Sequence, residues 1–217
     1  MAEELLHKKI ADSFNLFQSP PEIPGYITDN LGHDLRPYQE EPLEHFIFAQ
    51  ESDNANMSFN HLLFHMATGS GKTLVLAATM LYLFKQHNQQ NFIFFVNTDA
   101  IIRKTFDNLT NVSSSKYLFT KDGITIDGEK VDIQIVDVFP TLPDKNTIYL
   151  KLTTIQKLHM DLTEPRENSL TFESLEEDKV VLLADEAHHI NALTKRDKRK
   201  LNTKEAEEKT WENTVSK

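Results

Sequence analysis

The sequence contains no cysteine among its 217 residues, which excludes disulfides, thiolate nucleophiles and cysteine-ligated zinc sites. It also lacks a long hydrophobic run: the longest, residues 74–84, has eleven residues, well short of the roughly 20 that span a membrane. The acidic N-terminus lacks the basic start and long apolar stretch of a secretory signal. Together these absences favour a cytoplasmic protein that does not associate with a membrane.

Positive charge is also scarce, since 23 Lys and Arg against 33 Asp and Glu give a net charge of −10. Such a chain has little of the general attraction that brings proteins to nucleic acid. The charge is unevenly spread, because residues 194–217 hold eight basic and five acidic residues, a net of +3 that leaves −13 on the rest. That segment is either a solvated tail or a basic contact surface.

The remaining composition, with 39% hydrophobic and 26% charged residues, is typical of a folded domain. At roughly 100–200 residues per domain, the length predicts one lobe with appendages. Apolar residues at helical spacing predict a helix over residues 2–17, and three prolines then predict a linker ending near residue 26. We therefore expect an N-terminal part over 1–26, a main lobe over 27–193, and a separate charged segment over 194–217.

Buried strands and amphipathic helices alternate through the main lobe. The pattern predicts helices at residues 38–50 and 73–86 and buried strands at residues 61–65, 92–96, 148–152 and 180–183. This order is typical of an α/β fold with a mostly parallel sheet and helices on both faces. Residues 123–128 and 131–136 alternate like an exposed hairpin, which we interpret as an insertion at about 120–137 outside the central sheet.

A glycine-rich loop, His-Met-Ala-Thr-Gly-Ser-Gly-Lys-Thr at 65–73, lies between a predicted strand and a predicted helix. Its two glycines lack Cβ atoms, so the backbone can wrap a phosphate beside the positive end of the helix. Lys72 would reach the β- and γ-phosphates, and the Thr73 hydroxyl would bind Mg²⁺. Met66 makes the loop entrance bulkier than the general pattern, which has glycine there. The predicted nucleotide-binding residues of the loop are Thr68, Gly69, Ser70, Gly71, Lys72 and Thr73.

A second chemical signal is the apolar stretch 180–184, which ends in Asp185 and Glu186. Because ligands of a parallel sheet collect beyond the carboxyl ends of its strands, we expect Asp185 to face the same crevice as the phosphate loop. Asp185 would hold Mg²⁺, mostly through water, and Glu186 would orient or deprotonate an attacking water. Taken alone, two adjacent carboxylates are also compatible with an exposed turn.

These letters resemble motifs I and II of superfamily 2 helicases and translocases, with Thr-Gly-Ser-Gly-Lys-Thr at 68–73 and Asp-Glu-Ala-His at 185–188. Three further stretches resemble the upstream motif whose glutamine reads adenine, motif Ia and motif Ib, namely Leu-Arg-Pro-Tyr-Gln at 35–39, Val-Asn-Thr at 96–98 and Leu-Thr-Thr-Ile-Gln at 152–156. The motif sequences are most similar to those of the restriction subunit of type III restriction-modification enzymes, over about residues 30–215.

The resemblance implies a RecA-like first motor lobe that hydrolyses ATP with Mg²⁺ and binds double-stranded DNA. It assigns catalysis to Lys72, Asp185 and Glu186, magnesium to Thr73 and Asp185, adenine recognition to Gln39, and coupling of the nucleotide and DNA sites to His188. The candidate DNA contacts are Thr98, Arg103, Thr153 and Thr154, with Lys104, Lys151 and Lys157 as charged neighbours. Both basic pairs, Arg103 with Lys104 and Lys151 with Lys157, are equally compatible with a solvated helix face.

The same resemblance implies that the segment 194–217 is cut short before a second RecA-like lobe with arginine fingers. It also implies a nuclease domain further along the intact chain and a modification methyltransferase subunit as partners. A missing arginine finger lowers the hydrolysis rate by about 10³–10⁵, so this lobe should bind ATP more readily than it hydrolyses it.

Two other interpretations remain open. The chain could be a repair or RNA helicase lobe of the same superfamily, which would carry the same glutamine and phosphate loop. It could also be a nucleotide-binding interaction module that never turns over ATP.

His61 and His65 lack the glutamate of a zinc protease motif, so we expect core or strand-end residues rather than metal ligands. We expect Trp211 to pack in a terminal helix.

Overall fold

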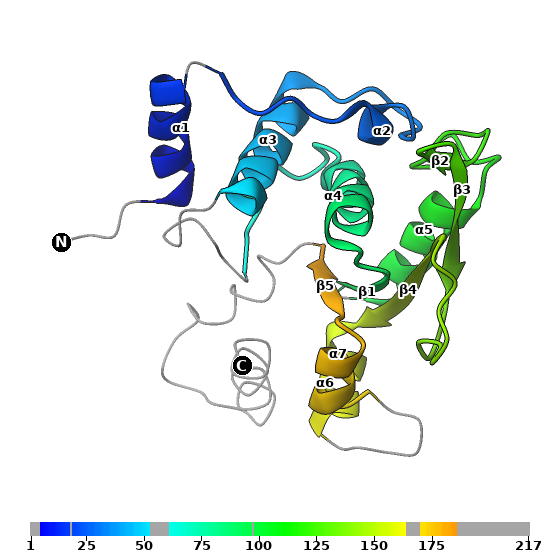
Figure 1. The fold of residues 1–217 in the computed structure, drawn as a ribbon. Helices are drawn as coiled ribbons and strands as arrows, with labels where there is room; N and C mark the ends of the chain where they lie inside the picture. Colours follow the sequence, from blue (N-terminus) through cyan, green and yellow to red (C-terminus); the bar gives the residue numbers. More distant parts are fainter. Residues whose placement is uncertain (1–4, 18, 53–60, 97, 164–169, 186–217) are drawn as a thin grey trace. The chain divides into compact units, whose positions relative to one another are not determined.

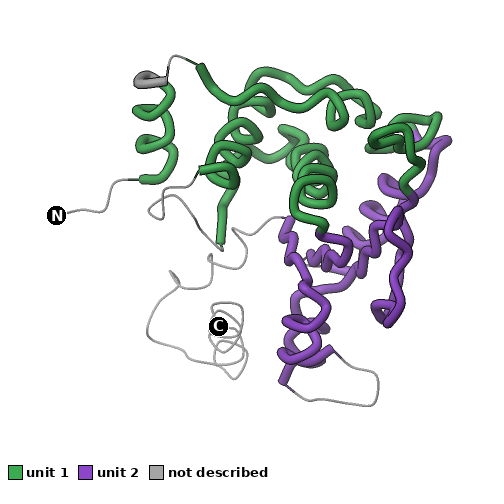
Figure 2. Tube along the Cα trace, in the orientation of Figure 1, with its two compact units in different colours: residues 1–88, 115–131 green, residues 89–114, 132–217 purple. Residues whose placement is uncertain are grey.

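The computed structural model describes residues 5–17, 19–52, 61–96, 98–163 and 170–185 (Figure 1). The chain divides into two compact units (Figure 2). Unit 1 comprises residues 1–88 and 115–131, and unit 2 comprises residues 89–114 and 132–217. Both units contribute to the main lobe expected over 27–193, so that division of the chain stays a prediction.

The core of unit 1 is built by helices that pack through aromatic side chains. Its helices are α1 (Leu6–Phe17), α2 (Gly25–Thr28), α3 (Pro37–Glu51) and α4 (Lys72–His87). The Phe14 ring of α1 lies 5.1 Å from the Phe48 ring of α3, and Phe46 of α3 lies 5.6 Å from Tyr82 of α4. Residues 74–82 of α4 are all buried, which explains why this helix is apolar almost all round. None of the helices in the described ranges is long and apolar enough to cross a membrane.

A second part of unit 1 is an antiparallel hairpin, formed by β2 (Ile124–Ile126) and the first residues of β3 (Glu129–Ile135). Asn30 ties the segment after α2 to this hairpin through hydrogen bonds to the backbone of Thr125. The Gly32 N–H donates to Leu118 O at 2.8 Å, and a Cβ at Gly32 would lie only 2.7 Å from Tyr117 O. Only glycine permits this close approach.

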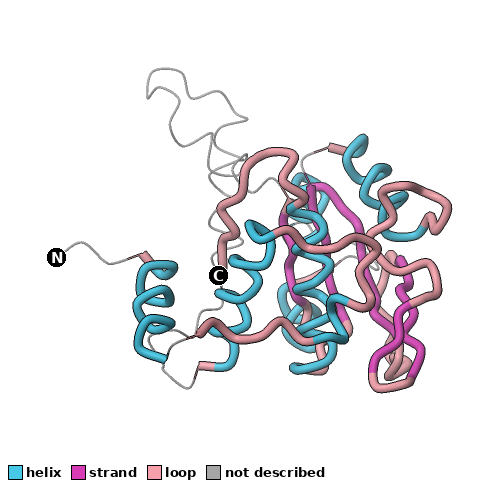
Figure 3. Tube along the Cα trace, turned by 90° about the horizontal axis from the view of Figure 1, so that it is seen from above, coloured by secondary structure: helices cyan, strands magenta, loops and turns pink. Residues whose placement is uncertain are grey.

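Unit 2 is a parallel sheet with helices on both faces. It contains β1 (Asn91–Val96), α5 (Asp99–Thr110), β4 (Thr147–Thr154), α6 (Ile155–Thr163), α7 (Phe172–Glu177) and β5 (Val181–Ala184). Strand β1 pairs in parallel with β4 on one side and with β5 on the other, and the strand order is β2-β3-β4-β1-β5. Figure 3 shows the strands in magenta and the helices in cyan. The predicted α/β class with a mostly parallel sheet is therefore confirmed.

Alternating side chains of β1 and β4 serve the two faces of this sheet. On one face, Ile93, Phe95 and Tyr149 join a buried cluster with Leu158 and Leu162 of α6. Helix α5 packs against β1 and β4, and Leu152 of β4 lies beside it with the opposite side-chain parity to Tyr149. The continuous apolar strands predicted from sequence are explained by this double cover.

Most predicted elements are confirmed within a few residues, but the strand at 61–65 is wrong. Residues 61–67 form neither helix nor strand, and Leu63 is 70% exposed. His61 and His65 are also exposed, so they are not core or strand-end residues. The reason is that a strand requires a hydrogen-bonded neighbour, and no described strand pairs with this segment. A short apolar run indicates burial but not the partner.

The predicted hairpin exists, but its interpretation as an insertion outside the central sheet is wrong. After pairing with β2, strand β3 continues as a member of the sheet, where residues 132–135 pair in parallel with residues 147–150 of β4. The alternating pattern fits a hairpin and a half-buried sheet strand equally well, because the two differ only in a partner that is distant in sequence.

Candidate nucleotide-binding site

The phosphate loop has the backbone geometry that the two glycines predict. Gly69 and Gly71 have φ angles of +79° and +83°, in the left-handed region that residues with a Cβ rarely adopt. The Ser70 N–H donates to Ala67 O at 3.2 Å, which closes the turn, and Gly71 is the N-cap of α4. The loop therefore delivers the chain directly into the positive end of a 16-residue helix.

Two features of the loop fit an anionic ligand with several oxygens. The Ser70 hydroxyl oxygen is buried and has no hydrogen-bond partner among the described residues. A Cβ at Gly69 would meet nothing within 4 Å among the described atoms, so space is open on that side of the loop. An unsatisfied buried hydroxyl beside a helix N-terminus is costly unless a ligand or water completes it. Phosphate oxygens supply that acceptor.

Lys72 and Thr73 occupy the first turn of α4, where the sequence placed them. Both residues are half-buried, and the Lys72 ammonium donates to Ala67 O at 3.4 Å across the loop. The lysine and the N-terminus of the helix are both positive, and the first turn carries no acidic residue that would offset them. The structure thus places the Lys72 ammonium where it can contact the oxygens of a phosphate bound by the loop.

Gln39 contacts the loop directly, although the two are 31 positions apart. Its Nε2 donates to Ser70 O at 2.7 Å, and its Oε1 accepts from the Arg36 N–H at 3.0 Å. The residue is 5% exposed. Sequence reasoning identified Gln39 but missed this contact, because no sequence signal reports which carbonyl a distant amide meets.

Asp185 follows β5 at the carboxyl end of the parallel sheet of unit 2, as predicted. It is half-buried, and its N–H donates to Phe95 O at 3.3 Å, which extends the pairing with β1 by one residue. Glu186, His188, Trp211 and the segment 194–217 lie outside the described residues. The phosphate loop belongs to unit 1 and Asp185 to unit 2, so their common crevice and shared Mg²⁺ stay predictions.

The predicted DNA contacts separate into exposed and buried residues. Thr98 is exposed at the N-cap of α5, and Arg103 and Lys104 are exposed on that helix. Thr153 and Thr154 are instead only 3% and 5% exposed. The Thr154 hydroxyl accepts from the Lys157 N–H at 3.3 Å at the start of α6, which is a helix-capping contact. Of the charged neighbours, Lys157 forms an ion pair with Asp99, and Lys151 donates a hydrogen bond to the backbone oxygen of Asp137.

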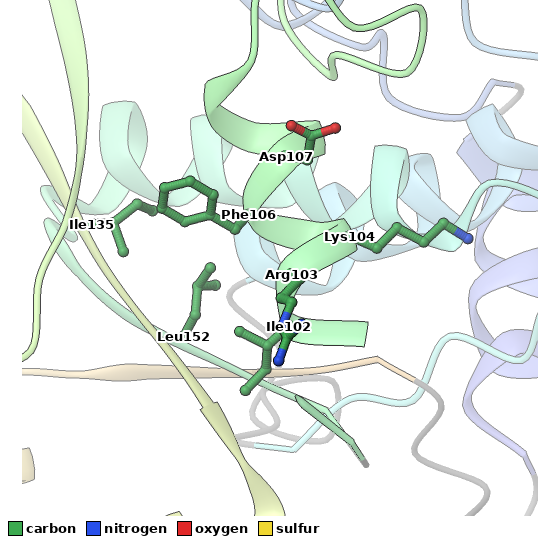
Figure 4. A pocket seen from close by; sticks show the side chains of 7 residues that line it. All are labelled: Ile102, Arg103, Lys104, Phe106, Asp107, Ile135 and Leu152. Carbon is green, nitrogen blue, oxygen red and sulfur yellow. The ribbon is translucent and has the colours of Figure 1, made fainter. Parts of the chain in front are cut away.

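Sequence reasoning missed a cavity of about 570 Å³ beside α5, at the carboxyl ends of β3 and β4. It is lined by Ile102, Arg103, Lys104, Phe106, Asp107, Ile135 and Leu152. Figure 4 shows Phe106 beside Ile135 and Leu152, while the Lys104 ammonium extends away from these apolar side chains. The lining therefore combines apolar side chains with the charged side chains of Arg103, Lys104 and Asp107, a combination that the separate patterns of α5, β3 and β4 do not reveal.

Comparison with known proteins supports the resemblance. The sequence pattern of the family described as "Type III restriction enzyme, res subunit" matches residues 32–215. The probable type III restriction-modification enzyme HindVIP Res subunit of Haemophilus influenzae is 39% identical over 181 residues, which cover 80% of this chain and 34% of that relative. This chain thus spans about a third of the relative's length. No solved structure matches the chain.

The family match covers the phosphate loop, the sheet of unit 2 and the acidic strand end together. It confirms the RecA-like P-loop class that the α/β fold and the loop geometry indicate. The chain belongs to the family of type III restriction enzyme Res subunits.

Proposed function

We propose that this chain is the ATP-binding first motor lobe of a DNA-dependent ATPase and translocase in a type III restriction-modification system. The observation that carries the proposal is the phosphate loop, in which two left-handed glycines adjoin the N-terminus of α4. Between them lies Ser70, whose buried hydroxyl has no hydrogen-bond partner within the described part of the chain. Family membership supports the biological setting, because the matched relative is a probable Res subunit.

Each part of the nucleotide would have its own residues. Backbone N–H groups of residues 68–73 and the Lys72 ammonium would hold the phosphates. Thr73 and Asp185 would hold Mg²⁺, directly or through water, and Glu186 would orient and deprotonate the water. Gln39 would favour adenine. When bound, ATP with Mg²⁺ supplies the phosphoanhydride bond whose hydrolysis drives movement along DNA.

The DNA side would involve α5 and the start of α6. Thr98 and Arg103 have the exposure that contact with a phosphodiester backbone needs, with Lys104 as a neighbour. Thr153 and Thr154 would take part only if their buried hydroxyls became accessible, and His188 would couple the two sites. The proposed partners are double-stranded DNA, a second RecA-like lobe, a nuclease domain and a modification methyltransferase subunit.

The test is a calorimetric titration of this chain with ATP and with GTP, each with and without Mg²⁺. Binding that requires Mg²⁺ and prefers ATP is the expected result. The same titration with added duplex DNA or RNA separates a restriction motor from an RNA helicase lobe, through the nucleic acid that changes the affinity. Absence of Mg²⁺-dependent binding to either nucleotide contradicts the proposed site.

A further inference from the structure

Gln39 connects the N-terminus of α3 to the phosphate loop by hydrogen bonds at both ends of its amide. The Oε1 atom accepts from the Arg36 N–H at 3.0 Å, and Nε2 donates to Ser70 O at 2.7 Å. The first bond is part of the N-terminal capping box of α3, a 15-residue helix, and it fixes the orientation of the Gln39 side chain. The second bond fixes a carbonyl between the two left-handed glycines.

The fit between Gln39 and the loop is also steric. A Cβ added at Gly71 would collide with the Gln39 amide nitrogen. The Gln39 side chain therefore occupies the space that a side chain at Gly71 would need. Because Gln39 is 5% exposed, this contact lies inside unit 1 rather than at its surface.

The hydrogen-bonding capacity of the amide limits what else Gln39 can do in this arrangement. A glutamine amide has two N–H donors and two acceptor lone pairs, and the two backbone bonds engage one of each. A base that hydrogen-bonds to the remaining N–H group or the remaining lone pair must reach a side chain that is nearly buried. The contact already present in the structure is to the loop, whichever base the nucleotide carries.

We infer that Gln39 is a positioning residue for the phosphate loop, which it holds in its binding shape through the Ser70 carbonyl. The inference rests on the proposed nucleotide site. Loss of the contact would lower the fraction of molecules with a competent loop, and the apparent dissociation constant rises in inverse proportion to that fraction. The effect must then be equal for every ligand that binds through its phosphates, in addition to any effect of Gln39 on adenine.

The experiment compares wild-type protein with Gln39→Met, which keeps the volume but removes both hydrogen bonds. Gln50→Met, a half-buried position near the other end of α3, is the matched control. Dissociation constants are measured with Mg²⁺ for ATP, GTP and inorganic tripolyphosphate. We expect Gln39→Met to weaken binding of GTP and tripolyphosphate by about tenfold and of ATP by at least as much, and Gln50→Met to weaken none. An unchanged tripolyphosphate constant overturns the inference.

Amide hydrogen exchange without ligand provides a second readout that does not depend on nucleotide binding. We expect exchange at residues 67–73 to become faster in Gln39→Met than in Gln50→Met, while exchange in β1 stays the same. Equal exchange of the loop in both variants contradicts the inference. If wild-type protein binds none of the three ligands, the proposed function fails, and the exchange comparison still decides whether Gln39 positions the loop.

Discussion

Asn30 and Thr125, 95 positions apart, are joined by two hydrogen bonds in which a side-chain amide takes the place of a strand. Asn30 Nδ2 donates to Thr125 O at 2.8 Å, and the Thr125 N–H donates to Asn30 Oδ1 at 2.7 Å. Asn30 Nδ2 also donates to Tyr26 O at 2.7 Å. The hairpin of unit 1 is thereby attached to the segment that leads into α3.

Asn30→Ala should lower the free energy of unfolding by about 2 kcal/mol, because it leaves backbone groups of Tyr26 and Thr125 without partners. Urea denaturation followed by circular dichroism measures the change. Thr125→Ser is the control, since it alters an exposed side chain and keeps both backbone bonds. Equal stability of Asn30→Ala and Thr125→Ser would contradict the role of this contact.

Lys72→Ala should abolish Mg²⁺-dependent nucleotide binding, because the ammonium is the charged group of the phosphate loop. Lys85→Ala is a matched control, since Lys85 lies on the same helix but in its last turn, where it pairs with Asp127. Calorimetric titration should show loss of binding in the first variant and retention in the second. Wild-type affinity in Lys72→Ala would rule out the assigned site.

The two loop glycines should differ in their tolerance of a methyl group. Gly69→Ala should cost about 1 kcal/mol from its positive φ alone, because its Cβ would point into open space. Gly71→Ala should cost more, since the same strain is joined by the collision with Gln39. Gly25→Ala, with no such φ and ample space, is the control. Thermal unfolding gives the order, and a reversed order for Gly69 and Gly71 would be incompatible with the structure.

The packing of α1 on α3 should weaken in mild acid. His45 of α3 packs against Phe14 of α1, with ring centres 5.3 Å apart. Burial lowers the pKa of His45 below its ordinary value of 6.5, a shift that Glu41 opposes and His7 assists. The unfolded chain then takes up a proton below about pH 6.5 that the folded chain resists, so stability falls as the pH decreases through that value. His45→Phe should flatten the dependence of the unfolding free energy on pH between 7.5 and 5.5, and an unchanged slope would argue against this origin.

Arg103→Ala should weaken binding of duplex DNA severalfold and reduce the salt dependence of the binding constant by about one ion, as expected for one phosphate contact. Lys145→Ala, an exposed residue of another loop in unit 2, is the control. Fluorescence anisotropy with duplex DNA and with RNA at several salt concentrations measures both quantities. A salt slope identical to that of wild-type protein would place the contact elsewhere.

Local patterns predicted the helices and the backbone turns of the loop well, for a physical reason. The apolar run of α4 and the proline at the start of α3 act within a few residues, and so do the left-handed turns at Gly69 and Gly71. Their preferences are therefore written into short stretches of sequence.

Features that depend on a distant partner were not predictable in this way. The segment 61–65 has the composition of a strand but no partner among the described residues, and β3 has a partner in β4 that its alternation does not identify. The contact of Gln39 with Ser70 is of the same kind, since 31 positions separate the amide from the carbonyl that it meets. The relation of Asp185 to the loop likewise depends on contacts far apart in sequence.

The pairing of β1 also has a consequence during synthesis. Its apolar residues 92–96 find their first strand partner in β4, which begins at residue 147, about 50 residues later. At translation rates of about 5–20 residues per second, this segment must wait about 3–10 seconds for that partner to be made. An apolar, β-prone stretch that carries no charge of its own is an aggregation hazard for as long as it is unpaired. We therefore expect the nascent chain to depend on a chaperone between these two events, and slower translation to lower the yield of folded protein.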